Sequence, residues 1–140
     1  MRMISKGFFY CIIFLSMLKI TYSQELICDD FKQGSFFLIS DEYPELFHKI
    51  YRTENSQIEI NQDGEEYHYW INWLDECTYV LRLKLDRKLN KKIDSLDLYI
   101  EENGGVLVEF MEIKENCIIS KASIRNIDDE VSNSIICLSR

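Results

Sequence analysis

The chain has 140 residues, with 16 Lys and Arg against 24 Asp and Glu, so its formal net charge at pH 7 is −8. An acidic protein repels phosphate backbones and anionic lipid, which argues against nucleic-acid binding. The length is enough for one domain and too short for two of ordinary size.

The first 23 residues have the pattern of a cleavable secretory signal peptide. Arg2 and Lys6 precede an apolar run at 7–18, and small residues lie one and three positions before Gln24. The apolar run is shorter than the roughly 20 residues that a membrane-spanning helix needs. We therefore expect cleavage after Ser23 and a mature domain at 24–140 that is secreted or periplasmic and has no membrane span.

Loss of the signal peptide makes the mature chain more acidic. Residues 1–23 contain three basic residues and no acid, so the mature net charge is 13 − 24 = −11. This balance strengthens the argument against nucleic acid, because binding to phosphates needs a basic patch. The densest basic run, at 87–92, is short, and a solvated loop explains it more simply.

Alternation of apolar and polar residues predicts strands along most of the mature chain. It is clearest at 66–73 and 77–86, which we take as the central pair of strands. Further strands are expected at 34–40, 48–54, 57–61, 96–101, 106–112 and 117–125. Asp63-Gly64 and Gly104-Gly105 lie between alternating runs and predict hairpin turns. About eight short strands in this order predict an antiparallel meander, closed as a barrel or folded as a sandwich.

The last segment shows a different period. Apolar residues recur at helical spacing, namely Ile127, Val131, Ile135 and Leu138, and the acids at 128–130 lie in the first turn. This pattern predicts a short amphipathic helix at about 128–138, with acids at its positive end. Its apolar stripe would cover the outward side of the central strands, where Trp70 and Val80 interrupt a polar face.

Four cysteines remain in the mature chain: Cys28, Cys77, Cys117 and Cys137. An even number in an exported protein predicts disulfides, and four cysteines allow three complete pairings. No two of them have the spacing of a zinc site, and neither His48 nor His68 has a partner at ligand spacing. We expect no metal and no cofactor.

Catalytic motifs are absent from the sequence. The run Glu59, Asn61, Asp63, Gly64 imitates the start of an EF-hand loop, but its twelfth position is Trp70, where a glutamate belongs. Adjacent acid pairs lie mostly at predicted turns, where solvation explains them, and no nucleophile elbow or phosphate loop occurs. We therefore expect a non-enzymatic domain. A hydrolase that acts through paired carboxylates is the alternative.

The expected function is binding of a ligand or partner. Trp70, ringed by His68 and Arg82 on one strand face, has the composition of a binding surface for an unknown protein partner. The same residues are also explained if Trp70 lies under the C-terminal helix and Arg82 pairs with an acid. A small apolar ligand could instead occupy a calycin-like barrel among Tyr67, Tyr69, Ile71 and Trp73.

Two short motifs carry a family resemblance. Residues 28–36 read C-x-x-F-x-x-G-x-F, residues 73–81 read W-x-x-x-C-x-Y-x-L, and Arg52 and the run Gln57, Ile58, Glu59 lie between them. This half of the mature chain resembles a family of small exported flavobacterial proteins of no established function, some of which carry the label DNA topoisomerase IV. Exported, acidic and without a nucleotide loop, the chain does not fit that label. The resemblance implies an exported β domain in which Cys28 pairs with Cys77, leaving Cys117 to pair with Cys137 or to stay reduced.

Overall fold

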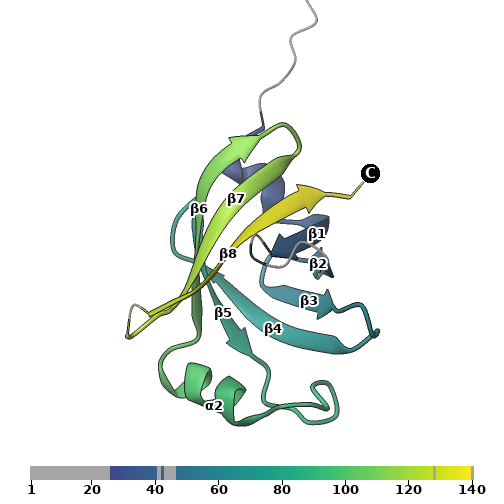
Figure 1. The fold of residues 1–140 in the computed structure, drawn as a ribbon, viewed down its shortest axis with the longest axis vertical. Helices are drawn as coiled ribbons and strands as arrows, with labels where there is room; N and C mark the ends of the chain where they lie inside the picture. Colours follow the sequence, from purple (N-terminus) through teal and green to yellow (C-terminus); the bar gives the residue numbers. More distant parts are fainter. Residues whose placement is uncertain (1–25, 41, 43–46, 128, 140) are drawn as a thin grey trace, which may run out of the picture.

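A computed structural model describes residues 26–40, 42, 47–127 and 129–139 of the chain; the predicted signal peptide at 1–23 lies outside the described residues. Eight antiparallel strands each pair with the next, and the last pairs with the first, so the sheet closes as a barrel (Figure 1). The strands are β1 (Gly34–Ser40), β2 (Phe47–Arg52), β3 (Ser56–Ile60), β4 (Glu66–Trp73), β5 (Thr78–Leu83), β6 (Val106–Lys114), β7 (Cys117–Ile124) and β8 (Asp129–Leu138). The meander is thus confirmed, and of its two predicted forms the barrel is the one observed.

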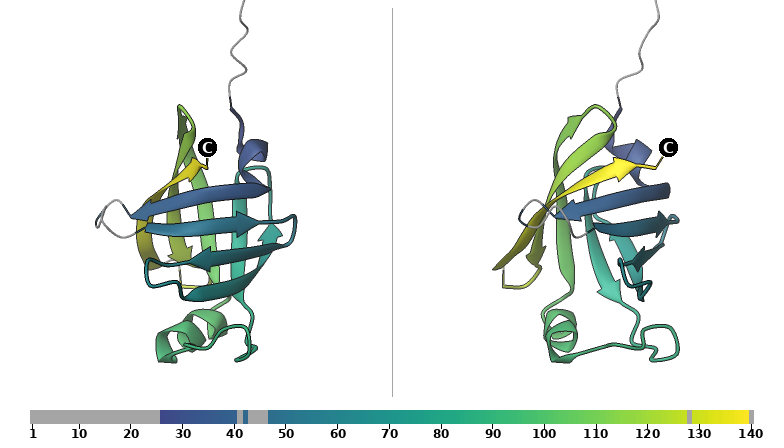
Figure 2. Two further views of the ribbon diagram at one scale, coloured as in Figure 1. Left: turned by 90° about the vertical axis from the view of Figure 1, so that its right-hand side faces the viewer. Right: turned by 45° about the vertical axis from the view of Figure 1, so that its right-hand side comes forward.

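The predicted strand at 96–101 is wrong, because this segment is the helix α2 (Ser95–Glu102). Its start is fixed by a capping box: the Asp94 carboxylate accepts from the amide of Asp97 at 2.9 Å, and the Asp97 carboxylate accepts from the amide of Asp94 at 3.0 Å. Glycines at 104 and 105 follow the helix with φ of 92° and 84° and turn the chain back into β6. Figure 2 shows α2 beyond one end of the barrel.

The predicted C-terminal helix at 128–138 is also wrong, because Asp129–Leu138 is strand β8. It pairs with both β7 and β1, placing Ile136 opposite Ile118 on one side and Leu38 on the other. Pairing along both edges satisfies the backbone amides and carbonyls of β8 and removes the open sheet edges. Trp70 therefore has no C-terminal helix above it and is 55% exposed, whereas Val80 is buried.

The barrel interior is filled by side chains in two clusters. One cluster surrounds Phe31 of the N-terminal 3₁₀ helix (Cys28–Phe31) and includes Phe36 and Ile136. The other is built from β4, β5 and β6 and includes Ile71, Tyr79, Leu81 and Val108. An eight-stranded barrel is just wide enough for such packing, and the 3₁₀ helix closes the end where Phe31 enters.

Two disulfides tie the chain. Cys28–Cys77 joins the 3₁₀ helix to the turn between β4 and β5, and is the pair implied by the family resemblance. Cys117–Cys137 joins directly opposed positions of β7 and β8. Paired disulfides are typical of an oxidising, extracellular-type environment. Among the residues described, no helix is long and apolar enough to cross a membrane.

Candidate functional site

A buried arginine begins a chain of polar side chains inside the barrel. Arg52 of β2 is 4% exposed, and its guanidinium donates to the carbonyl of Phe31 at 2.6 Å, to the hydroxyl of Tyr79 at 2.9 Å and to Oε1 of Gln57 at 2.8 Å. Its Cζ also lies 4.8 Å from the centre of the Tyr79 ring and 5.2 Å from that of Phe36. Three acceptors and two aromatic faces replace the water that a buried cation loses.

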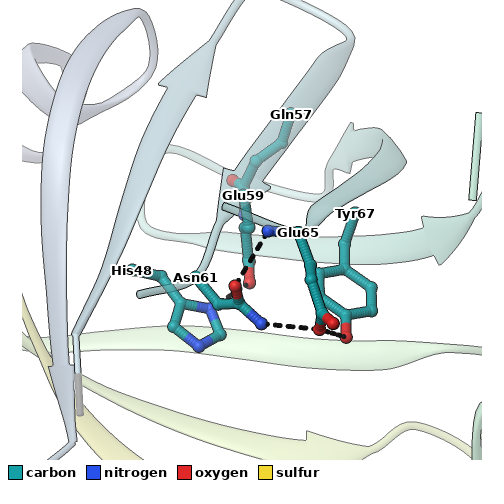
Figure 3. Close-up of polar contacts among 6 residues, drawn as sticks. All are labelled: His48, Gln57, Glu59, Asn61, Glu65 and Tyr67. Atoms are coloured by element: carbon teal, nitrogen blue, oxygen red, sulfur yellow. Dashed lines mark hydrogen bonds and ion pairs between the residues drawn. The ribbon is translucent and has the colours of Figure 1, made fainter. Parts of the chain in front are cut away.

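The polar chain continues from Gln57 to a histidine. Gln57 Nε2 donates to Glu59 Oε1 at 2.7 Å, and Glu59 Oε2 lies 3.2 Å from His48 Nδ1. Figure 3 shows these side chains on the neighbouring strands β2 and β3. The hydrogen bond to Glu59 raises the pKa of His48, although burial of the imidazole opposes it. Glu59 is thus linked to Arg52 through Gln57 and directly to His48.

Glu59 and His48 open into a pocket of about 270 Å³ at the barrel end that faces α2. We call it the α2 pocket; its walls are formed by His48, Glu59, Asn61, Tyr67, Tyr69, Lys92, Asp94 and Asp97. Strands β2, β3 and β4 supply the inward-facing side chains, and the start of α2 supplies the two aspartates. The pocket therefore depends on the position of α2 as well as on the barrel.

Helix α2 is held to the barrel by Glu101 near its C-terminal end. Glu101 Oε1 accepts from the amide of Leu83 at 2.6 Å, and its Oε2 accepts from Arg82 Nε at 2.9 Å. The Glu101 side chain is only 10% exposed, but Arg82 is 45% exposed, so the bond to the Leu83 amide is the better shielded of the two. At the other end of the helix, burial raises the pKa of the Asp97 carboxyl, because the charged form loses hydration.

Tyr69 of β4 is one of the residues that line the α2 pocket. Its ring packs against the β4–β6 cluster, while its hydroxyl makes no hydrogen bond to any part of the chain that the structure describes. Burial raises the pKa of this phenol well above its ordinary value, and the charges of Glu59, Asp97 and Glu101 raise it further. Because Tyr69 lines the pocket, its hydroxyl is open to a hydrogen bond from water or from a ligand.

The outer side of the pocket is closed by the β3–β4 hairpin. Asn61 Nδ2 donates to Glu65 Oε2 at 2.9 Å, and the Tyr67 hydroxyl donates to the same oxygen at 3.4 Å (Figure 3). Lys92 forms an ion pair with the other oxygen of Glu65. The EF-hand-like run is thus a hairpin turn, with Gly64 at a φ of 80°.

The residues that the sequence singled out for binding lie on the outside of the barrel, away from the α2 pocket. Trp70 and Arg82 are opposed on β4 and β5, and the ammonium of Lys84 lies 4.0 Å from the Trp70 ring centre. Arg82 bonds Glu101, and the His68 ring lies 3.0 Å from Glu66. His68, Trp70 and Arg82 are therefore neighbours, but both polar members are already engaged within the chain.

Sequence reasoning identified only part of the α2 pocket. Of the four side chains expected to surround an apolar ligand, Tyr67 and Tyr69 line this pocket, whose walls are mostly polar, whereas Ile71 and Trp73 pack in the β4–β6 cluster. His48, Glu59 and Asp97 were not singled out as site residues. Alternation did contain one signal, since His48, Ile50 and Arg52 share the inward face of β2.

The described ranges contain no group of three or more His, Cys, Asp or Glu side chains able to hold a metal ion. The chain was also compared with known proteins. It matches no family profile, no curated protein and no solved structure at a significant level.

Proposed function

We propose that this protein is an exported domain, secreted or periplasmic, that binds a small ligand in the α2 pocket. The observation that carries the proposal is the convergence on one pocket of three carboxylates, the His48 imidazole and the Tyr69 hydroxyl, which makes no hydrogen bond within the described part of the chain. A few polar groups that converge in a concave pocket are the usual means by which a protein orients a small ligand.

The surroundings of Tyr69 suit binding. Glu59 is held in place by Gln57 and His48, and α2 is held by Glu101, so the polar groups of the pocket are already oriented before a ligand arrives. The volume of about 270 Å³ suits a compact ligand rather than a polymer.

An NMR screen of the ¹⁵N-labelled mature protein with a library of small polar and apolar fragments tests this proposal. Fragments that bind should shift the backbone amides of Glu59, Tyr69 and Asp97. The variant Tyr69→Phe keeps the ring and removes only the hydroxyl, and should weaken their binding. Tyr51→Phe is the matched control, because Tyr51 is exposed on the outside of the barrel. Fragments that shift only the amides of Trp70 and Arg82 would contradict the proposal and favour a partner-binding face there.

A second candidate function is carboxylate-dependent hydrolysis. Glu59, Asp94 and Asp97 converge on one pocket, and burial raises the pKa of Asp97, as a general acid requires. Against it, Asp94 and Asp97 bond each other's backbone amides, and Glu59 accepts from Gln57 and faces His48. Turnover of nitrophenyl glycosides or esters that Asp97→Asn abolishes would favour the enzyme over the binding module.

A further inference from the structure

The charge of the α2 pocket indicates which class of ligand it takes, if the proposed function is correct. Three carboxylates line the pocket, from Glu59, Asp94 and Asp97. The basic groups are His48 and Lys92, and both already face acids: His48 faces Glu59, and Lys92 is paired with Glu65. The unbalanced charge of the walls is therefore negative.

The acids around Tyr69 agree with this sign. Burial raises the pKa of its phenol, and the charges of Glu59, Asp97 and Glu101 raise it further. The carboxylates that act on the Tyr69 hydroxyl thus agree with the negative charge of the pocket walls.

The hydrogen-bonding groups of the pocket agree with its charge. A carboxylate has about four acceptor positions, and Asp94 and Asp97 each use one of them on a backbone amide. The Tyr69 hydroxyl can accept as well as donate. The donors are few, since the side-chain amide of Asn61 is occupied by Glu65. An ammonium group would find several acceptors here, whereas an anion would face three carboxylates.

The walls also offer aromatic surface for the rest of a ligand. The rings of Tyr67 and Tyr69 both line the pocket, and aromatic faces attract cations and cover apolar groups. Its volume is near the lower end for small-molecule sites. We propose that the α2 pocket binds a small primary amine in its ammonium form, with the charged group between the carboxylates of Glu59 and Asp97 and its body against Tyr67 and Tyr69.

Three probes that share a phenylethyl body and differ in their polar end group test this inference. They are 2-phenylethylamine, 2-phenylethanol and 3-phenylpropanoate, and n-butylamine serves as an aliphatic amine. Binding to the mature protein is followed at pH 7 by NMR titration of the Glu59, Tyr69 and Asp97 amides. We expect at least one amine to bind at least tenfold more tightly than the alcohol, which corresponds to about 1.4 kcal/mol. The carboxylate should not bind, and added NaCl should weaken the amine.

Variants locate the charge preference. Glu59→Gln and Asp97→Asn should each weaken amine binding about tenfold or more. Glu112→Gln makes the same change on an exposed residue of β6, outside the pocket, and should leave the affinity unchanged. Two different acids are tested because Glu59→Gln also disturbs the bonds to Gln57 and His48, and circular dichroism checks that each variant is folded.

The possible failures are distinguishable. If the alcohol or the carboxylate shifts the pocket amides as strongly as the amines, the ligand class is wrong and the binding site stands. If the amines shift no pocket amide at 10 mM, or bind equally well to Glu59→Gln and Asp97→Asn, the inference is also overturned. The proposed function itself fails only if the wider fragment screen finds no ligand that depends on Tyr69.

Discussion

Replacing Arg52 by methionine tests the buried polar chain that leads to the α2 pocket. Methionine has a similar length and no charge, so the change leaves the carbonyl of Phe31, the hydroxyl of Tyr79 and Oε1 of Gln57 without their donor. These three residues and Arg52 are all buried, so water cannot simply replace the lost bonds. The variant therefore isolates the contribution of one guanidinium.

The magnitude follows from two opposing effects. A buried polar group left without a partner costs about 1–3 kcal/mol, so three such groups sum to roughly 3–9 kcal/mol. Removing a buried cation gives back several kcal/mol of desolvation free energy. The Tyr79 hydroxyl can also rotate and keep part of its bonding. We expect Arg52→Met to lower the free energy of unfolding by about 3 kcal/mol, within the range for broken buried charge networks.

Urea unfolding of the oxidised protein at pH 7 gives the free energy of unfolding by linear extrapolation. Arg82→Met is the matched control, because Arg82 is 45% exposed and pairs with a single glutamate, so its loss should cost about 1 kcal/mol or less. The two variants should therefore differ by about 2 kcal/mol. If Arg52→Met is no less stable than Arg82→Met, the buried bonds contribute nothing net and the reasoning fails.

Arg52→Met should also change the titration of His48. Loss of the Arg52 charge leaves Glu59 less balanced, so the pKa of His48, already raised by Glu59, should rise further. The C2 proton of the imidazole reports this pKa by NMR. An unchanged or lower pKa would show that Gln57 does not connect Arg52 electrostatically to the pocket.

Three further predictions concern stability. Non-reducing peptide mapping should give Cys28–Cys77 and Cys117–Cys137, and any other cross-linked peptide contradicts the strand order. The two disulfides close loops of 49 and 20 residues, so replacing both cysteines of a pair by alanine should lower the free energy of unfolding by about 4 and 3 kcal/mol respectively. The folded-state pKa of His48 is raised above 6.5, so the contribution of its charged form to the free energy of unfolding is complete below about pH 6.5 and is lost as pH rises through the folded pKa. Wild type should therefore exceed His48→Gln in stability by more at about pH 5.5 than at pH 8.5, and a constant difference contradicts this. Gly105→Ala places Cβ 2.3 Å from the Leu81 carbonyl oxygen and should lower the free energy of unfolding by about 3 kcal/mol. Gly64→Ala, with open space at a similar φ, should lower it by about 1 kcal/mol, and equal losses in urea titrations would refute the clash.

The central strands could be predicted because their pattern is local. Period-two alternation at 66–73 coincides with β4, and that at 77–86 contains β5, since each strand has one face toward the interior. The turn between β3 and β4 was also readable, because Asp63-Gly64 supplies the positive φ that the turn requires. These features depend on neighbouring residues alone.

The C-terminal strand could not be predicted in the same way. Its apolar residues recur at helical spacing, but Ile135 and Ile136 belong to a strand whose pairing partners lie on β1 and β7. Closure of the barrel requires a strand between those two, and the bonds that closure provides outweigh the local periodicity. A sequence pattern contains no information on which two edges remain to be joined.

The other mispredicted segment builds one side of the pocket, which explains why sequence reasoning missed the acidic wall of the site. In a strand, Asp97 and Glu101 would be separated by about 13 Å along the chain direction, and they could not both act on one hydroxyl. In α2 they are four residues apart on one helix face, with a rise of about 6 Å between them. Both charges then reach Tyr69. Glu101 also fixes the helix to β5, and Asp97 caps it and lines the pocket. The acidic character of the site therefore follows from the helical state of 95–102.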